Sequence, residues 1–276
     1  MDSKDFGVPN VDRWPVRIRR PNERRSLSRS ATRALDVLEL FGQMRRPLRA
    51  IEIAKVLELH PSTANQLLKT MVESAHLTFN AGMKTYLPSP RLASFAAWMV
   101  ESYGTDKNLR DLLRHAQGAI GEIVTLSTPN DIYMQILDRV GSVGLPATGD
   151  TERGMRISMF GTVIGAAYLS TLKRPDLTRL IERARIPPPD LSQISAELAE
   201  IRRRGLAEGP IMNGSVWCLA AALPPGGFPA PLVLGVAGPA ERILPKSDQI
   251  RALLLDAAKR YGASVGAVAE TAESAE

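Results

Sequence analysis

Apolar residues recur at helical spacing between Pro47 and Leu77, and the rest of the N-terminal region is organised around this stretch. From Ala64 onward the apolar positions have the i, i+3, i+4, i+7 spacing of one helical face: Ala64, Leu67, Leu68 and Met71. The opposite face is polar and consists of Ser62, Asn65, Gln66, Lys69 and Glu73. Pro61 suits the first helical position, so the helix is predicted to begin near His60. All of these polar side chains except Glu73 donate hydrogen bonds, so the face can contact DNA.

A shorter apolar pattern precedes this helix. Ile51 to Leu57 predicts a helix that buries Ile53, Ala54 and Leu57, and three residues separate it from the second helix. Two helices joined by such a turn form either a helix-turn-helix, whose second helix enters the major groove, or an ordinary helical hairpin. Thr78 to Tyr86 has turn residues at its centre and predicts a β-hairpin, which after a helix-turn-helix is the wing of a winged helix.

The segments before this region are a helix and a basic arm. Ser30 to Phe41 predicts a first helix, capped by Ser28 or Ser30 and packed behind the helix-turn-helix. Met1 to Ser26 has few large apolar residues and predicts a disordered or loosely attached arm. The arginines of the arm include Arg17, Arg19, Arg20, Arg24 and Arg25. They could contact DNA, in the minor groove or along the phosphate backbone. The alternative is a solvated tail without fixed contacts.

After the predicted wing, two prolines interrupt the chain and a helical pattern resumes at Arg91. Its apolar stripe has Trp98 beside it and consists of Leu92, Phe95, Ala96, Met99 and Tyr103. The segment is too short to bury this stripe alone. It is therefore a linker helix that pairs with a second subunit, or a helix docked on its own domain.

Beyond Ile120 the pattern alternates between strands and helices. Predicted strands are Glu122 to Ser127, Ile132 to Arg139, Val216 to Leu223 and Leu232 to Ala237. Predicted helices are Asn108 to Ile120, Ser158 to Leu172, Asp176 to Arg185, Leu191 to Arg204 and Ser247 to Ala263. The first two strands form a hairpin around Thr128 to Asp131. The fold class is therefore mixed α/β, of the α+β kind.

Length and charge distribution divide the chain. At 276 residues it exceeds a usual single domain, and we expect a small domain followed by a larger one. Residues 1–91 hold 16 Lys and Arg against 9 Asp and Glu, whereas the remainder holds 19 against 20. A charged run is usually only a solvated surface, but the basic end carries the predicted helix-turn-helix, and such asymmetry between two domains is the expected electrostatic footprint of nucleic-acid binding. Neither a signal peptide nor an apolar run of membrane-spanning length is evident, so we expect a cytoplasmic protein.

The residues that could carry catalysis are few. Cys218 is the single cysteine, which excludes intrachain disulfides and cysteine-based metal clusters. It lies in an apolar strand and is expected to be a buried, unreactive thiol. The histidines His60, His76 and His115 have no pairing suited to a metal or a general base. We therefore expect no enzyme, no metal and no cofactor. The alternative is a small-molecule-binding or hydrolytic protein whose basic N-terminal domain serves protein contact.

Several short runs resemble one family in their order. The runs in the N-terminal part are Arg33-Ala34-Leu35-Asp36-Val37-Leu38, Pro47-Leu48, Glu52-Ile53-Ala54, Pro61-Ser62-Thr63 and Leu67-Leu68. Those in the C-terminal part are Gly165-Ala166-Ala167-Tyr168-Leu169, Arg204-Gly205-Leu206, Cys218-Leu219-Ala220-Ala221 and Gly238-Pro239. Together they resemble the IclR-type bacterial transcription regulators over roughly residues 27 to 265.

The resemblance implies a domain organisation. The expected parts are a basic flexible arm (residues 1–26), a winged helix-turn-helix DNA-binding domain (27–90), a linker and dimerisation helix (91–112), a GAF/profilin-like effector-binding domain (113–265) and a tail (266–276). It also implies a dimer, or a dimer of dimers forming a homotetramer, on a palindromic operator in double-stranded DNA.

The DNA contacts are predicted on the first helix, the helix-turn-helix and the wing. They are Arg29, Arg33, Arg49, Ser62, Thr63, Asn65, Gln66, Lys69 and Lys84. The family commonly has a basic residue where this chain has Gln66, and usually has Gly where it has Glu58. Because glutamine pairs best with adenine, the operator is expected to depend less on guanine.

The resemblance also implies an effector pocket in the C-terminal domain. The alternative is that the pocket is closed and the domain only dimerises. The expected lining of the pocket is Leu145, Ile157, Val163, Ile164, Cys218, Gly235 and Ala237. Family members that bind very small polar acids have hydroxyl side chains at the positions of Gly235 and Ala237. Their absence disfavours a compact acid unless Arg156 or backbone N–H groups pair with it, and favours a larger, more apolar organic effector such as an aromatic one.

Overall fold

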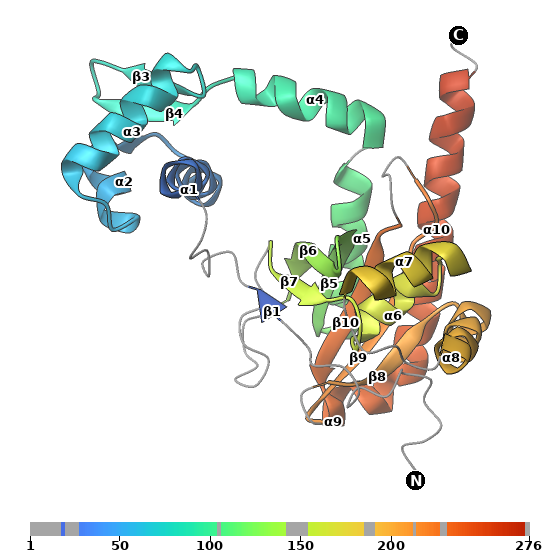
Figure 1. The fold of residues 1–276 in the computed structure, drawn as a ribbon. Helices are drawn as coiled ribbons and strands as arrows, with labels where there is room; N and C mark the ends of the chain where they lie inside the picture. Colours follow the sequence, from blue (N-terminus) through green and yellow to red (C-terminus); the bar gives the residue numbers. More distant parts are fainter. Residues whose placement is uncertain are drawn as a thin grey trace. The chain divides into compact units, whose positions relative to one another are not determined.

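The computed structural model describes residues 18–19, 28–103, 106–141, 154–184, 191–211, 214–226 and 231–273. The chain divides into two compact units. The described residues between 24 and 102 form one unit, here called the head. The described residues before 24 and from 103 onward form the other, here called the sensor domain after the role that the family resemblance implies. Figure 1 labels the elements of both.

The head combines helices with a small sheet. Its helices are α1 (Arg29–Met44), α2 (Ala50–Val56), α3 (Pro61–Glu73) and, after the wing, α4 (Arg91–Tyr103). Its strands are β2 (Leu48–Arg49), β3 (Leu77–Asn80) and β4 (Thr85–Pro88), in the order β2-β4-β3. The core joins α1 to α3 through residues that are almost fully buried: Val37, Leu40, Phe41, Leu48, Ile53, Leu68, Met71 and Leu77. The predicted winged helix-turn-helix is present, and β2 adds a strand that two residues were too few to predict.

The sensor domain is built on one antiparallel sheet. Its strands are β1 (Ile18–Arg19), β5 (Ile123–Asn130), β6 (Tyr133–Val140), β7 (Arg156–Ser158), β8 (Ala207–Ile211), β9 (Val216–Ala222) and β10 (Val233–Pro239). Their order is β1-β7-β6-β5-β10-β9-β8. The mixed α/β fold class is therefore confirmed.

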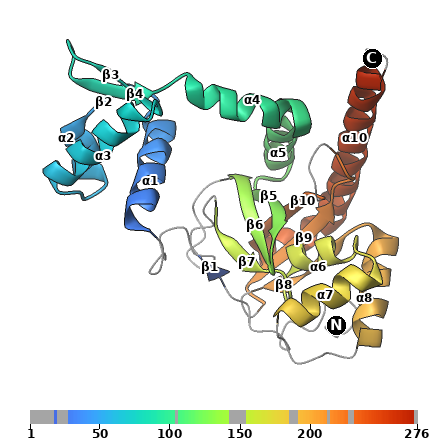
Figure 2. The same cartoon turned by 45° about the horizontal axis from the view of Figure 1, so that its top comes forward.

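Both faces of this sheet are covered by helices (Figure 2). Helices α6 (Val163–Leu169), α7 (Arg174–Ala184) and α8 (Leu191–Arg204) share one core with the sheet, and α5 (Asp106–Ile120) and α10 (Ser247–Glu273) share the other. Helix α9 (Ala240–Ile243) and the 3-10 turn η2 (Leu244–Lys246) directly precede α10 in the chain. Alternate residues of β9 serve the two cores, because successive side chains of a strand point to opposite faces: Cys218 and Ala220 face α6, whereas Leu219 and Ala221 face α10.

Several expected boundaries were wrong. The helix predicted over Ser158 to Leu172 is shorter, because residues 156–158 form β7 and Gly161, at φ 75°, turns the chain before α6. The hairpin of β5 and β6 turns at Asp131, at φ 55°, so the strands continue through most of the stretch predicted as a turn. Part of the predicted arm is a strand, since Ile18 and Arg19 pair with β7. The remaining arm residues lie outside the described residues.

Candidate nucleic-acid interface and sensor core

The polar face of α3 is fixed by burial of its apolar face. Ala64, Leu68 and Met71 are buried in the head core, which turns the opposite side of the helix outward. The exposed side chains include Ser62, Asn65, Gln66, Lys69 and Glu73, and also Thr70, while Thr63 is half-buried. The exposed set therefore contains all five residues of the polar face that the apolar spacing predicts.

The N-terminus of α3 carries a cap that the sequence did not assign. His60 has extended backbone, and its Nδ1 accepts a hydrogen bond from the Ser62 N–H at 3.4 Å. The helix begins at Pro61, as predicted from the missing N–H of proline. A histidine directly before a proline was the available signal, but histidine is not among the usual capping residues.

The wing brings two further cations to one end of the small sheet. Arg49 lies opposite Thr85 in the pairing of β2 with β4, and Lys84 directly precedes Thr85. Lys84 has φ 53°, and the turn is closed by a hydrogen bond from the Met83 N–H to Asn80 Oδ1 at 3.0 Å. Both Arg49 and Lys84 are exposed, so they can reach phosphates beside a groove that α3 enters.

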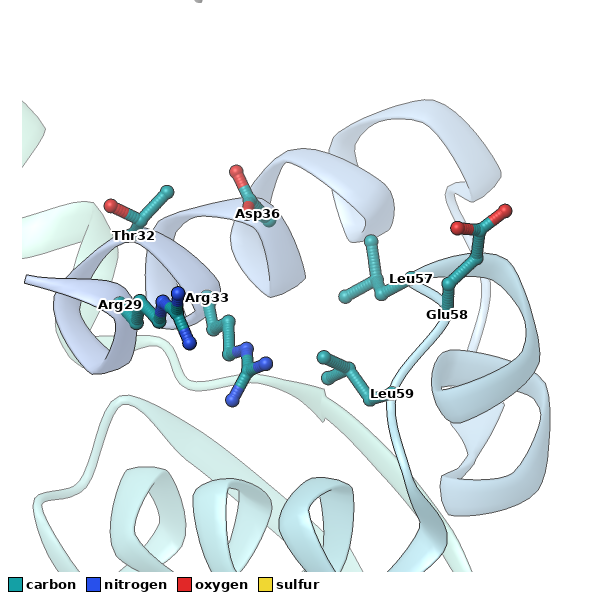
Figure 3. Close-up of a pocket in the computed structure, with 7 residues that line it drawn as sticks. All are labelled: Arg29, Thr32, Arg33, Asp36, Leu57, Glu58 and Leu59. Carbon is teal, nitrogen blue, oxygen red and sulfur yellow. The ribbon is translucent and has the colours of Figure 1, made fainter. Parts of the chain in front are cut away.

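Arg29 and Arg33 lie in a groove of about 330 Å³ between the start of α1 and the turn of the helix-turn-helix. In Figure 3 their guanidinium groups point to the side of the groove where Leu59 lies, and the carboxylates of Asp36 and Glu58 point away from them. Among the described residues, neither arginine has an ion-pair partner. Two unpaired guanidinium groups one helical turn apart are suited to an anion such as a phosphate.

The turn between α2 and α3 has a strained residue. Glu58 has φ 51°, a conformation that L-residues rarely adopt. The Leu59 N–H donates to the Ala54 carbonyl at 2.8 Å, and the Glu58 N–H donates to the Lys55 carbonyl at 3.4 Å. These are the two hydrogen bonds of a Schellman motif, whose left-handed position is usually glycine.

Helix α4 begins against the rest of the head. Arg91 Nη1 donates to the Ser74 carbonyl at 3.1 Å, and the Phe95 ring is parallel to His76 with ring centroids 6.1 Å apart. Phe95 nevertheless remains 51% exposed, and Ala96 is exposed beside it. The first turn of α4 is therefore docked on its own head, which leaves Phe95 and Ala96 of the apolar stripe exposed. The side chains of Trp98, Met99 and Tyr103 lie outside the described residues.

Six of the predicted effector residues lie at one core of the sensor domain. Val163, Ile164 and Cys218 are buried there, and Ile157 and Ala237 pack against the same cluster. Gly235 lies under α6, since a Cβ atom added to it would be 3.2 Å from Ile164 Cγ2 and 3.0 Å from Thr125 Oγ1. Leu145 lies outside the described residues. The Ile164 side chain therefore takes up the space above Gly235, and a ligand would have to displace it.

Arg156, the predicted partner of an acidic effector, is engaged elsewhere. Its guanidinium lies over the Tyr133 ring, 5.6 Å from the centroid.

A second groove, of about 320 Å³, lies between α5 and α10 on the opposite side of the sheet.

The single cysteine is a buried thiol. Burial raises the pKa of the Cys218 thiol to about 12, so it is protonated at neutral pH. Among the described residues, no three His, Cys, Asp or Glu side chains are placed to hold a metal ion. No helix in the described part of the chain is long and apolar enough to cross a membrane.

Comparisons with known proteins point in one direction. The sequence model of the IclR helix-turn-helix domain matches residues 30–77. The probable transcriptional regulator SauR of Cupriavidus necator is 26% identical over 183 residues, which cover 64% of this chain and 72% of that protein. The HTH-type transcriptional regulator XynR of Escherichia coli K12 is 26% identical over 191 residues, covering 64% of this chain and 73% of that protein.

The fold also has solved counterparts. The crystal structure of the Thermotoga maritima IclR superposes with a TM-score of 0.56 at 18% identity, covering 84% of this chain and 98% of that one. The effector domain of the IclR regulator from Acinetobacter sp. ADP1 gives a TM-score of 0.50 at 21% identity, covering 56% of this chain and 94% of that one. These likenesses concern the fold.

Proposed function

We propose that this chain, which belongs to the IclR-type DNA-binding transcriptional regulators, binds a palindromic operator as a dimer or dimer of dimers under the control of a small organic effector. The observation that carries the proposal is the exposed polar face of α3, held outward by a buried apolar face on a basic head. Relatives named as transcriptional regulators support a role without catalysis.

The proposed contacts fall into two groups with different consequences. Ser62, Thr63, Asn65 and Gln66, near the N-terminus of α3, are assigned to base edges and nearby phosphates. The cations are assigned to phosphates: Arg29, Arg33, Arg49, Lys69 and Lys84. Phosphate contacts position the head on any sequence, whereas base contacts select one. The Nζ atom of Lys69 lies 3.8 Å from Oε1 of the exposed Glu73. Such a surface ion pair is weak, so Lys69 remains available to DNA.

A pair of alanine substitutions separates the two groups. Gln66→Ala should weaken binding to the preferred operator by roughly 1–3 kcal/mol and relax the choice of base at one position. Lys69→Ala, one helical turn away on the same face, should weaken binding to all sequences alike and lower the salt dependence. Both are measured by competition among operator variants in a titration of fluorescent DNA. An unchanged base preference in Gln66→Ala would show that α3 is oriented differently.

The effector site is proposed in the core between α6 and the sheet. Ile157, Val163, Ile164, Cys218, Gly235 and Ala237 are apolar apart from the thiol, so a ligand there is held mainly by shape. A buried carboxylate without matched donors costs several kcal/mol, and Arg156 already lies over Tyr133. We therefore expect an aromatic compound or another organic molecule with a large apolar part.

Calorimetry tests this assignment against a panel of aromatic acids, their esters or amides, and short keto acids. Ile164→Ala removes the side chain above Gly235 and should strengthen binding of the larger ligands. Ile250→Ala is the matched control, because Ile250 is equally an isoleucine of the sensor core but lies on the opposite side of the sheet. Tight binding of a two- or three-carbon acid with none of the larger compounds would contradict the proposal.

A further inference from the structure

The sheet of the sensor domain is completed by residues that precede the head. Strand β1 pairs antiparallel with β7, with Ile18 opposite Ile157 and Arg19 opposite Arg156. Without β1, β7 would be the outermost strand on that side of the sheet. Exposed edge strands present unpaired N–H and C=O groups and are normally covered. Both ribbon views show β1 beside β7 at this edge (Figures 1 and 2).

The path of the chain gives this pairing a consequence for the head. Strand β1 belongs to the sensor domain, the head follows it in the chain, and the chain returns to the sensor domain at Tyr103. The head therefore has two covalent connections to the sensor domain. Nine residue steps separate Arg19 from Ser28, the N-cap of α1. At the reach of an extended chain, they span at most about 32 Å.

The paired strand is also part of the proposed effector site. Ile157 is the register partner of Ile18 and packs against the core that holds Val163 and Ile164. Immediately after β7, the Met159 N–H donates to the Ile132 carbonyl at 3.0 Å, and the chain then turns into α6. Ile164 lies in α6, the helix that follows this segment. A ligand that displaces the Ile164 side chain would therefore act close to the segment that joins β7 to α6.

We propose that β1 is a second tether of the head, and that its pairing with β7 makes the freedom of the head depend on the effector core. The link between β7 and the effector rests on the function proposed above, whereas the tether itself rests on the strand pairing alone. Because such coupling is reciprocal, a ligand that alters β7 changes the restraint on the head, and a DNA-bound head changes the affinity for the ligand. Loss of the pairing frees one of the two connections.

A cross-link between register partners tests the tether without DNA or effector. In the full chain, Ile18→Cys with Ile157→Cys places two thiols on directly opposed residues, whose Cα separation of about 4.5–5.5 Å suits a disulfide. The native Cys218 is buried, with its pKa raised to about 12, so it does not compete at pH 8. The matched control is Ile18→Cys with Ile211→Cys, since β8 forms the opposite edge of the same sheet.

Mild oxidation should convert most of the Ile18→Cys/Ile157→Cys protein into a monomer-sized species with both new thiols lost, and leave the control pair reduced. Mass spectrometry and thiol titration measure this. A cross-link no more frequent than in the control, or one that forms only between two chains, would overturn the proposal.

The effect on the head is measured by comparing oxidised and reduced forms of the same cross-linked protein. A permanent tether removes orientations available to the head, so the oxidised form should bind operator DNA at least about threefold more weakly, and reductant should restore the affinity. The single variant Ile18→Cys should show no such difference. Equal affinity of the oxidised and reduced forms for operator DNA would overturn the proposal that β1 restrains the head. Absence of DNA binding in both forms would instead refute the proposed function and leave the cross-link result standing.

Discussion

Replacing Glu58 by glycine should stabilise the head. Glu58 occupies the left-handed position of the Schellman motif after α2, with φ 51°. A non-glycine residue pays about 1–2 kcal/mol for this conformation, while the glycine variant loses about 0.5–1 kcal/mol through its freer unfolded chain. The middle values of these two ranges give a net gain for Glu58→Gly of about 0.8 kcal/mol. For a unit of the size of residues 24–102, this raises the melting temperature by about 3–6 °C.

Differential scanning calorimetry of the full chain measures the gain, and two variants isolate its cause. Glu58→Gln keeps the left-handed strain but removes the charge, so it should leave the melting temperature nearly unchanged. Ala75→Gly repeats the change at the end of α3, where Ala75 has φ 58° and the His76 N–H donates to the Met71 carbonyl at 2.8 Å. It should give a comparable gain.

Two outcomes would refute this reasoning. A lower melting temperature for Glu58→Gly would mean that the turn does not hold the left-handed conformation in solution. An equal gain from Glu58→Gln would assign the effect to removal of a negative charge at the C-terminus of α2, where a carboxylate opposes the helix dipole.

Three further predictions concern packing and reactivity. Phe95→Glu places a charge on the exposed stripe of α4 and should convert dimers to monomers in sedimentation, with weaker operator binding; an unchanged dimer would move the subunit contact elsewhere. Gly165→Ala should destabilise the sensor domain by about 3 kcal/mol or more in urea unfolding, because the new Cβ would lie 1.7 Å from the Met159 carbonyl oxygen. The control Gly118→Ala, whose new Cβ has no atom within 4 Å, should be neutral or stabilising. Equal changes in the free energy of unfolding for the two variants would contradict the packing at α6. Cys218 should resist iodoacetamide at pH 8 until the protein is unfolded, and rapid labelling of the native protein would contradict its burial.

The head was predictable because its information is local. Pro61 indicates where α3 begins, and the spacing of Ala64, Leu68 and Met71 determines its exposed face. The family resemblance places glycine at the position of Glu58, and glycine is the residue that most readily adopts the positive φ found there. In contrast, the groove around Arg29 and Arg33 brings together residues about 25 positions apart, which no periodicity specifies.

The sensor domain was less predictable at its edges. Strands β7 and β8 are short, and β7 precedes small residues that continue the helical pattern of α6, so both were missed. Strand β1 has only two residues, and its pairing with β7 joins segments more than 130 positions apart. Such pairing depends on an open sheet edge, which becomes evident only once the sheet is formed.

The central claim is tested most directly by retardation of a DNA fragment from upstream of the protein's own gene, measured across a salt series. Arg29, Arg33, Arg49, Lys69 and Lys84 are proposed to neutralise phosphates, so log K should fall with log salt with a slope between about −4 and −9 for a dimer. A scrambled fragment of the same length should bind more weakly at every salt concentration. Equal binding of both fragments, or a slope near zero, would contradict the account of this chain as a sequence-reading regulator.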